Sequence, residues 1–312
     1  MTDEHQSGVH APLTNEVWTQ SWELILPIEN TGICSGVSAV EFMGKVHAFF
    51  MSEKEPDHLA LSYRVFSKRP DNTLIVEKQE DFTYAGLTRL RPAVTVHDGH
   101  LFCFNTVLDK TVHYHVFSGT EWSHKGVVPG VLTDTAPAAL GFGDTLHLAV
   151  QGTYNGELYH KVFHNFEWKS SIKIPGINIK GSPSLALFDN LLHMAITGTN
   201  NELYVGALLP ERWEFFYRSP YYTVLGSPAL SVRGQFLVCA SRTLADQHFV
   251  TEILREIYDG SGRKEISTHL DRTIGRYLSE PCLISYADQF YLIGQRPCND
   301  LAVSVYRPRV TE

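Results

Sequence analysis

The sequence repeats a unit of four short apolar segments, and consecutive copies start 45 to 54 residues apart. The clearest copy spans residues 181–213, where turns at Asp189-Asn190 and at residues 197–201 separate the segments. Apolar runs this short, bounded by Asn, Asp and Gly, are typical of β-strands. A four-stranded unit cannot bury both of its faces alone, so such a chain must stack its units against one another.

A small residue marks the first segment of every unit, and five of these six residues directly follow a proline. Proline suits the first residue of a strand, which needs no donor for the sheet, and small side chains suit inner strands that crowd around one axis. The sequence therefore predicts an all-β fold, a six-bladed β-propeller. The six small residues, at intervals of 54, 45, 46, 45 and 53, are Ala39, Ala93, Ala138, Ser184, Ala229 and Cys282.

The two ends of the chain predict how the ring closes. The last unit, residues 280–306, contains only three strands, whereas residues 16–27 resemble an outer strand without the inner three. Their order of tryptophan followed by proline is shared with the outer strands that begin near Trp122 and Trp168. We therefore expect residues 18–27 to pair with the final blade and to remove sheet edges that would otherwise invite aggregation.

Length and composition fit a single domain. An array of repeats grows by adding neighbours, so residues 15–312 are predicted to form one six-bladed propeller domain and residues 1–14 a flexible N-terminal tail. The net charge of -8 provides no basic surface for binding nucleic acid. No apolar run is long enough to span a bilayer.

The N-terminus and the cysteines bear on localisation. The first eight residues lack the basic and apolar regions of a secretory signal. The five cysteines are an odd number, and three lie in predicted strands, which fits reduced thiols packed in a core better than a disulfide framework. These features predict a cytoplasmic protein, or one exported without a cleavable signal peptide.

Two turn-and-strand segments share one pattern. They are residues 152–161, Gly-Thr-Tyr-Asn-Gly-Glu-Leu-Tyr-His-Lys, and residues 198–204, Gly-Thr-Asn-Asn-Glu-Leu-Tyr. This pattern resembles the Gly-Thr-Asp/Asn-Asn/Gly-x-Leu-Tyr/Trp-His-Lys turn and strand of the bacterial and fungal propeller lectins, which include the fucose-specific six-bladed lectins. Trp168 and Trp213 also fall where that family's outer-strand tryptophan would lie.

The resemblance is good over residues 134–215, fair over residues 91–130 and weak elsewhere, and it implies the fold more strongly than the activity. In fucose-binding members it implies sites between blades, built from arginine, glutamate and aromatic rings. Arginine occurs here only one residue after the matching position, at Arg242 and Arg296, so we expect one or two specialised pockets instead of repeated fucose sites. The residues at the matching position are Met51, Thr106, Gln151, Thr197, Ser241 and Gln295.

Polar side chains beside aromatic rings make up the candidate ligand site. Amides, hydroxyls, carboxylates and rings are the groups that a sugar site uses. Each also has a structural explanation, because Asn and Gly favour turns and an outer-strand tryptophan packs between blades. The predicted ligand-binding residues are Gln151, Thr153, Tyr154, Glu157, Tyr159, Trp168, Thr197, Asn200, Glu202, Tyr204, Trp213, Arg242 and Arg296.

The sequence predicts no cofactor and no metal. His47, His147 and His193 share one position in three units, but equivalent positions need not converge, and a metal site needs several ligands at fixed distances. There is no nucleophile elbow, zinc-protease motif, phosphate loop or dinucleotide fingerprint. Glycosidase chemistry would need two carboxylates at a set separation, and the candidates are Glu157, Glu202, Glu252 and Asp300.

Three functions remain open. The first is a lectin that binds a glycan or a glycosylated small molecule, where a homo-oligomer would raise avidity. The second is an enzyme on the same scaffold, acting without a metal on a small hydrophobic or glycosylated substrate beneath loops of the longer first and fifth units. The third is a platform for protein interactions. The extra residues of the longer units are 52–57, 68–72, 244–248 and 259–264.

Overall fold

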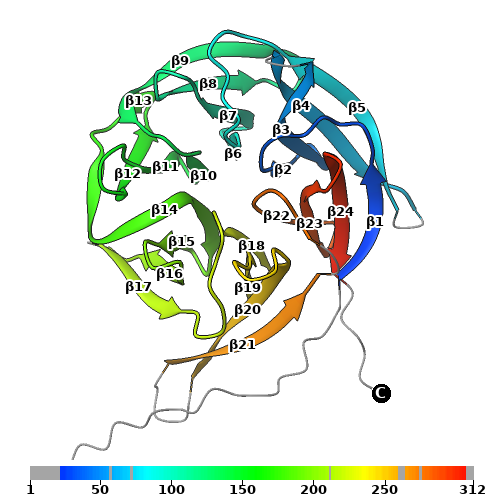
Figure 1. Ribbon diagram of the computed structural model, residues 1–312. Helices are drawn as coiled ribbons and strands as arrows, with labels where there is room; N and C mark the ends of the chain where they lie inside the picture. Colours follow the sequence, from blue (N-terminus) through cyan, green and yellow to red (C-terminus); the bar gives the residue numbers. More distant parts are fainter. Residues whose placement is uncertain are drawn as a thin grey trace, which may run out of the picture.

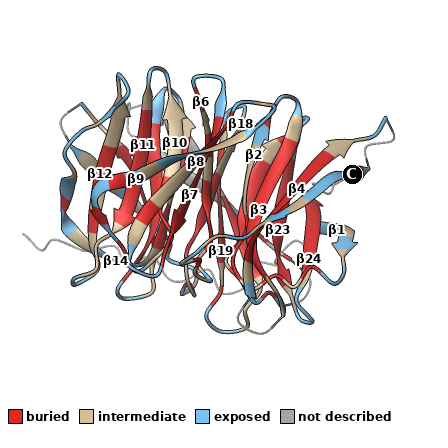
Figure 2. Cartoon of the chain, turned by 90° about the horizontal axis from the view of Figure 1, so that it is seen from above, coloured by how far each residue is buried: buried red, intermediate tan, exposed pale blue. Residues whose placement is uncertain are grey.

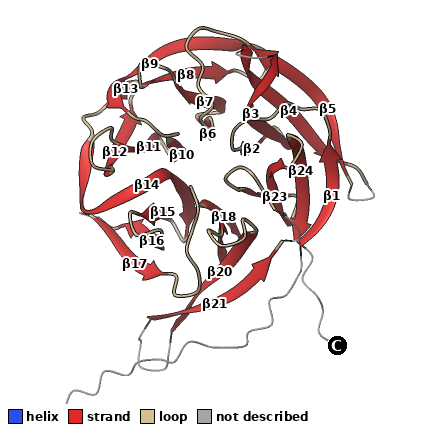
Figure 3. Ribbon diagram, in the orientation of Figure 1, coloured by secondary structure: helices blue, strands red, loops and turns tan. Residues whose placement is uncertain are grey.

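The computed structural model describes residues 22–55, 58–70, 73–210, 212–258, 264–273 and 276–306. Within these ranges the chain forms strands, turns and loops without any helix, as Figure 3 shows. Consequently no described residue belongs to a helix with the length and hydropathy of a membrane span. The predicted tail, residues 1–14, and residues 18–21 of the predicted closing strand lie outside the described residues.

Six four-stranded antiparallel blades surround a central axis (Figure 1). This arrangement confirms the all-β, six-bladed propeller. The first blade contains β2 (Ser38–Phe42), β3 (Lys45–Glu55), β4 (His58–Lys68) and β5 (Leu74–Phe82). The second contains β6 (Ala93–His97), β7 (His100–Thr106), β8 (Thr111–Phe117) and β9 (Trp122–Leu132).

The remaining four blades follow the same order from the axis outward. The third contains β10 (Ala138–Phe142), β11 (Thr145–Gln151), β12 (Glu157–His164), the short β13 (Glu167–Trp168) and the start of β14 (Ile172–Phe188). The fourth contains the end of β14, β15 (Leu191–Gly198), β16 (Leu203–Leu208) and β17 (Trp213–Arg218). The fifth contains β18 (Ala229–Arg233), β19 (Phe236–Arg242), β20 (Phe249–Tyr258) and β21 (Lys264–Arg272). The sixth contains β22 (Cys282–Tyr286), β23 (Gln289–Arg296), β24 (Asp300–Tyr306) and β1 (Trp22–Ile28).

One strand is shared by two blades. β14 begins as the outer strand of the third blade, where it pairs with β12, and continues as the inner strand of the fourth, where it pairs with β15. Gly181 has a φ of 75°, and a β-carbon there would lie 2.8 Å from Ser227 Oγ of the next blade. Glycine therefore lets the chain pass from the rim to the axis without leaving the sheet.

The N-terminal strand closes the ring, as predicted. β1 pairs antiparallel with β24 and forms the outer strand of the last blade. At the same seam the Gln295 side-chain amide donates a hydrogen bond to the Ile33 carbonyl at 2.7 Å. The last blade thus gains its fourth strand from the other end of the chain, and the edge of β24 is paired.

The core is a ring of six apolar clusters, one at each junction between adjacent blades. Figure 2 shows the buried parts of the strands standing side by side, with exposed turns at both faces of the ring. A tryptophan near the start of four outer strands packs against the preceding blade, so each blade depends on its neighbour for burial. These tryptophans are Trp22, Trp122, Trp168 and Trp213.

Small side chains line the axis, where they surround a cavity of about 100 Å³. The predicted alignment of the repeats was wrong by one residue in the first blade. Ser38, and not Ala39, is the residue that corresponds to Ala93 of the second blade. Ser38 pairs with Phe49 as Ala93 pairs with Phe104, and both phenyl rings face the next blade. Successive side chains on a strand alternate, so a shift of one residue turns Ala39 to the opposite face.

The extra residues of the longer units belong partly to strands and partly to the connections between them. Residues 52–55 continue β3, which pairs with β4 as far as Glu55 and His58, and Lys68 ends β4. The expected loops over one face are therefore hairpins at these positions, whereas residues 244–248 do connect two strands. Residues 56, 57, 71, 72 and 259–263 lie outside the described residues.

Candidate functional site

Glu157, Tyr159 and Lys173 form a hydrogen-bonded group in the third blade. A turn at Asn155-Gly156, both with positive φ, leads the chain into β12. The Tyr159 hydroxyl donates to Glu157 Oε2 at 2.6 Å, and Lys173 Nζ donates to Glu157 Oε1 at 2.5 Å. The hydrogen bond from Lys173 lowers the pKa of Glu157, so this carboxylate is ionised at neutral pH.

The fourth blade contains the same group with arginine as its cation. The Tyr204 hydroxyl donates to Glu202 Oε2 at 2.7 Å, and Arg218 forms an ion pair with Glu202 Oε1. The Asn200 amide adds a bond of 2.5 Å to Glu202 Oε2 and one of 2.9 Å to the Tyr204 hydroxyl. The bond from Arg218 lowers the pKa of Glu202, and this carboxylate is also ionised.

We call this arrangement the Glu-Tyr-cation triad. Its acid lies at the start of the third strand, its tyrosine two residues later, and its cation directly opposite that tyrosine on the outer strand. Sequence reasoning identified the acids and tyrosines but missed Lys173 and Arg218. These cations are 45 residues apart, the same interval that separates Glu157 from Glu202, so the repeat spacing was a signal that could have found them.

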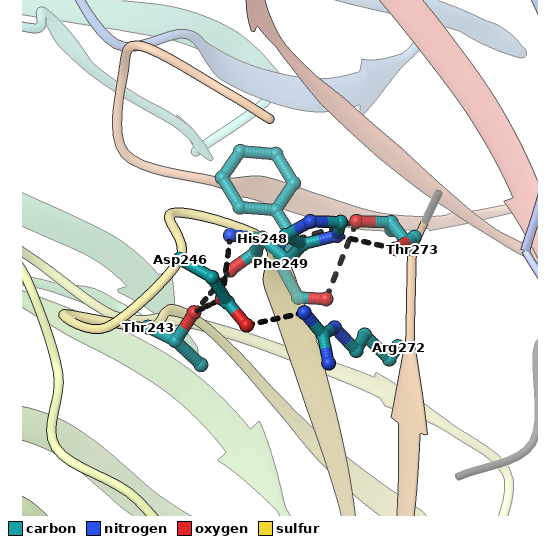
Figure 4. Close-up of polar contacts among 6 residues, drawn as sticks. All are labelled: Thr243, Asp246, His248, Phe249, Arg272 and Thr273. Atoms are coloured by element: carbon teal, nitrogen blue, oxygen red, sulfur yellow. Dashed lines mark hydrogen bonds and ion pairs between the residues drawn. The ribbon is translucent and has the colours of Figure 1, made fainter. Parts of the chain in front are cut away.

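The fifth blade retains only the cation of the triad. Arg272 pairs in register with Val250, which stands where the third and fourth blades have Tyr159 and Tyr204. Arg272 instead forms an ion pair with Asp246, which lies in the connection between β19 and β20, as Figure 4 shows. His248 Nδ1 lies within hydrogen-bond distance, 2.9 Å, of the Thr273 carbonyl. The charge of Arg272 is therefore balanced within its own blade.

A hollow of about 350 Å³ lies beside the triad of the third blade. Four predicted residues line it, namely Thr153, Tyr154, Glu157 and Tyr159, together with Val131 of the second blade. Tyr154 is 78% exposed, so its ring is open to solvent. This part of the predicted site therefore combines a carboxylate, a hydroxyl and two aromatic rings around one space.

A second hollow of about 580 Å³ lies beside the triad of the fourth blade. Glu202 and Arg218 line one part of it, and residues 219–223, which lead to the next blade, line the rest. Tyr221 and Tyr222 in that segment supply two further rings that sequence reasoning did not select. Both triads thus border open space, and each contains a carboxylate with a cation beside it.

Gln151 and Thr197 hold neighbouring blades together. The Gln151 amide donates to the Ile179 carbonyl at 2.7 Å, and the Thr197 hydroxyl donates to the Gly226 carbonyl at 2.7 Å. Each bond joins the end of a second strand to the segment that enters the next blade, as Gln295 does at the seam. The side-chain donors of Gln151 and Thr197 therefore form hydrogen bonds between blades of the propeller.

Trp168 and Trp213 pack at blade junctions. The Trp168 ring centroid lies 6.1 Å from those of Phe104 and Tyr114 in the preceding blade, and that of Trp213 lies 5.6 Å from His160. The two Nε1 atoms are buried and form no hydrogen bond within the described ranges. Their position explains the recurring tryptophan as an element of packing between blades.

Arg242 and Arg296 lie in the fifth and sixth blades, apart from both triads. The expected matching position was wrong by one residue in the fifth blade, where Arg242 and not Ser241 corresponds to Gln295, because the Leu225 N–H donates to the Arg242 carbonyl as the Leu278 N–H donates to that of Gln295. Arg242 Nη1 donates to the Tyr277 carbonyl at 3.1 Å, and burial lowers the pKa of Arg242. Arg296 ends β23 and is half-buried. The structure therefore does not bring these two arginines together with the polar residues of the lectin-like turns.

The four candidate catalytic carboxylates are each in a different blade. Glu252 is fully buried and accepts hydrogen bonds from Tyr217, at 2.6 Å, and Ser219, at 2.5 Å. Burial raises the pKa of Glu252. Asp300 Oδ1 accepts a hydrogen bond from the backbone N–H of Asn30, where the first and last strands meet.

The histidines that share a position in three blades are buried within the protein. His47 Nδ1 lies 2.6 Å from the Tyr63 hydroxyl, and His147 Nδ1 lies 2.9 Å from His160 Nε2. Burial lowers the pKa values of His47 and His160 to about 4. In the described part of the chain, no group of three or more His, Cys, Asp or Glu side chains is placed to hold a metal ion.

No family model matches this chain, and no curated protein matches its sequence. Solved structures do match its fold. AofleA from Arthrobotrys oligospora, solved as a mutant with three arginines replaced by alanine, is 12% identical over 94% of this chain and 88% of its own, with a TM-score of 0.68. SapL1 lectin in complex with alpha methyl fucoside is 11% identical over 90% and 98%, with a TM-score of 0.63.

The six-bladed Aleuria aurantia lectin, described with a novel fucose recognition mode, is 12% identical over 88% of this chain and 92% of its own, with a TM-score of 0.62. Two of these three neighbours are thus lectins whose descriptions name fucose or a fucoside, and the Aleuria aurantia lectin is a six-bladed propeller. At 11 to 12% identity these likenesses show the fold of the chain.

Proposed function

We propose that this protein is a lectin-like propeller that binds a glycan, or a glycosylated small molecule, at the triads of its third and fourth blades. The observation that carries the proposal is the recurrence of the triad in adjacent blades, each time beside a hollow. An ionised carboxylate accepts hydrogen bonds from sugar hydroxyls, a cation donates them, and an aromatic ring covers the apolar face of the sugar.

Fucosides are the first ligands to test. SapL1 was solved with alpha methyl fucoside, and a single-residue mutant of the Aleuria aurantia lectin was solved with Fucalpha1-6GlcNAc. We infer that this chain is a distant member of the same lectin family, because the fold and the lectin-like turns of residues 152–161 and 198–204 agree. The triads differ from each other in their cation, Lys173 against Arg218, which favours two specialised pockets over equivalent ones.

The test is a glycan array followed by calorimetry with methyl α-L-fucoside and other simple glycosides. The double variant Glu157→Gln with Glu202→Gln keeps the shape of both acids but removes their charge. We expect it to weaken binding at least about tenfold, since hydrogen bonds to charged groups contribute roughly 1.5–3 kcal/mol. Calorimetry should also give two sites per chain for the unaltered protein.

A matched control uses two other acids of the same blades. Glu167 pairs with Lys169 and Glu214 pairs with Arg212, and neither acid lines either hollow. The variant Glu167→Gln with Glu214→Gln should bind as the unaltered protein does. The proposal fails if no sugar binds at about 10 mM, where the binding free energy would be below about 3 kcal/mol. It also fails if both double variants bind equally well.

A further inference from the structure

A third hollow, of about 520 Å³, lies between the second and third blades at the opposite face of the ring. The triads stand where second strands lead into third strands, whereas this hollow lies where first strands turn into second strands. The rings of Phe102 and Tyr114 from the second blade, and of Phe163 and Phe166 from the third, line it. Polar and charged side chains, among them Asp98, Glu121 and Lys125, complete the lining. The size of the hollow, and its combination of aromatic rings with a few polar groups, are those of a site for a small organic molecule.

His97 lines this hollow and carries one buried polar atom that has no partner among the described residues. The residue is 9% exposed, and its Nδ1 atom is buried with no hydrogen-bond partner among the described residues. Its ring centroid lies 5.9 Å from that of Phe102 and 6.3 Å from that of Phe163. Burial lowers the pKa of His97, so the imidazole is neutral. An unpaired buried polar atom destabilises the protein, and a ligand that forms a hydrogen bond with it relieves that cost.

Phe166 stands at the mouth of the hollow in a strained turn. Asn165 and Phe166 have φ values of 52° and 61°, and the second position of such a two-residue turn favours glycine. Phe166 is also 88% exposed, so its ring contributes little to the core. A bulky side chain in the left-handed region is strained, and such strained residues cluster at ligand sites.

The corresponding cleft between the first and second blades is covered. Phe42 ends β2 as His97 ends β6, and its ring lies 6.2 Å from that of Phe117 in an edge-on contact. The next residue, Met43, reaches the turn of the second blade, where its Cε atom lies 2.8 Å from the place of a β-carbon on Gly119. The second cleft has His97 and an aspartate at these two positions, which leaves its mouth open.

We propose that the cleft lined by Phe102, Tyr114, Phe163 and Phe166 binds a small planar aromatic molecule that carries one hydroxyl or N–H group. The ring of the ligand stacks among the four aromatic side chains. Its polar group forms a hydrogen bond with His97 Nδ1, which no described residue of the protein satisfies. This site is separate from the triads and does not depend on sugar binding.

The experiment titrates the full-length protein with 2-naphthol and, as a matched compound, with 2-methoxynaphthalene, which keeps the fused rings but cannot donate a hydrogen bond. The first variant is His97→Phe, which copies Phe42 of the first blade and is therefore compatible with the fold. The second is Phe166→Gly, which relieves the strained turn. The control is Leu108→Ala, since Leu108 is a 74% exposed residue in a turn at the other face.

We expect 2-naphthol to bind at one site per chain and each of the two variants to weaken it at least about fivefold, or roughly 1 kcal/mol. The methoxy compound should bind the unaltered protein more weakly than 2-naphthol does and should lose that difference in His97→Phe. Leu108→Ala should bind like the unaltered protein. The proposal is overturned if 2-naphthol fails to bind at about 2 mM, or if His97→Phe and Phe166→Gly, with unchanged circular dichroism, bind it as the control does.

Discussion

The cleft between the second and third blades is hollow at both of its ends, and the two ends differ in chemistry. At one end Glu157, Tyr159 and Lys173 form a charged, hydrogen-bonded group. At the other end Phe102 and Phe163 form aromatic walls around a neutral imidazole. Between the ends lies a packed cluster that includes Phe104, Leu146, Leu148 and the ring of Trp168.

The contrast shows how one junction can serve two ligands. The middle of each strand is fixed by packing against the neighbouring blade, because a change of volume there is felt across the junction. The strand ends and turns are free of that constraint, so each end can acquire its own side chains. The repeat therefore provides a rigid packed junction, and the residues at its two ends determine which ligands can bind.

The largest loss of stability is expected when the packing between the second and third blades is disrupted. Trp168→Ala deletes the ring that contacts Phe104, Tyr114 and Phe163. Replacing a buried tryptophan by alanine costs roughly 3–5 kcal/mol, and a loss near the lower end of that range is expected because Trp168 is only partly buried. Urea denaturation measures this loss, and binding of both fucoside and 2-naphthol should fall together.

The matched variant is Trp168→Phe, which keeps an aromatic ring and removes an Nε1 atom that is buried without a partner among the described residues. It should cost less than about 1.5 kcal/mol and leave both ligands bound. If Trp168→Ala abolishes binding at one end only, with little loss of stability, the two ends do not share a common wall and the comparison fails.

The second largest effect should distinguish the two ends of the cleft, because Glu157→Gln should weaken only one of the two ligands. Glu157→Gln should reduce the number of fucoside sites from two to one by weakening the third-blade site about tenfold. It should change 2-naphthol affinity by less than about twofold, because the packed cluster around Trp168 lies between the two hollows. Calorimetry with each ligand on the same preparation measures both. Equal weakening of the two ligands would show that the ends are coupled.

The sequence predicted the fold well because propeller geometry repeats. Small inner residues, short apolar strands and an incomplete last unit follow from crowding at an axis and from the need to pair every edge. The error at Ala39 arose because Ser38 and Ala39 are both small, and only the pairing of Ser38 with Phe49 reveals which one faces the next blade.

The candidate site was only partly predictable. Glu157 and Glu202 were found because acids beside turn residues form a local pattern, whereas Lys173 and Arg218 lie 16 residues further along and meet the acids only through strand pairing. The aromatic cleft was missed for a different reason. Phe102 and Phe163 have the sequence pattern of core residues, and the exposure of Phe166 depends on a backbone conformation that composition does not reveal.

Acid should affect the two ends at different pH values. Burial lowers the pKa of His97 from 6.5, against smaller opposite effects of Asp98 and Asp144. The neutral imidazole therefore persists at pH 6.5 and above, and 2-naphthol binding should decline only as the pH falls below 6.5. Lys173 lowers the pKa of Glu157 from 4.5, so fucoside binding should hold down to pH 4.5 or lower.

Titrations of both ligands at intervals between about pH 8 and pH 4.5 measure this order. The midpoint of the decline in 2-naphthol binding should lie below pH 6.5, since burial lowers the pKa of His97. In His97→Phe the residual naphthol binding should not depend on pH. A decline that begins above the ordinary histidine pKa of 6.5, or an earlier loss of fucoside than of naphthol, would contradict the assignment.

The smallest effect concerns the turn at Phe166. Phe166→Gly should raise the free energy of unfolding by about 1 kcal/mol. Glycine adopts a positive φ without steric cost, and this relief of strain outweighs the greater entropy that glycine gives to the unfolded chain. Asn165→Gly is the matched control, and it should give a smaller gain because asparagine already tolerates this conformation. Urea denaturation with unchanged m-values measures both. A gain in stability together with a loss of naphthol affinity would mean that Phe166 is retained for its ligand, whereas a loss of stability would mean that its ring supports the fold and that the strain has no bearing on binding.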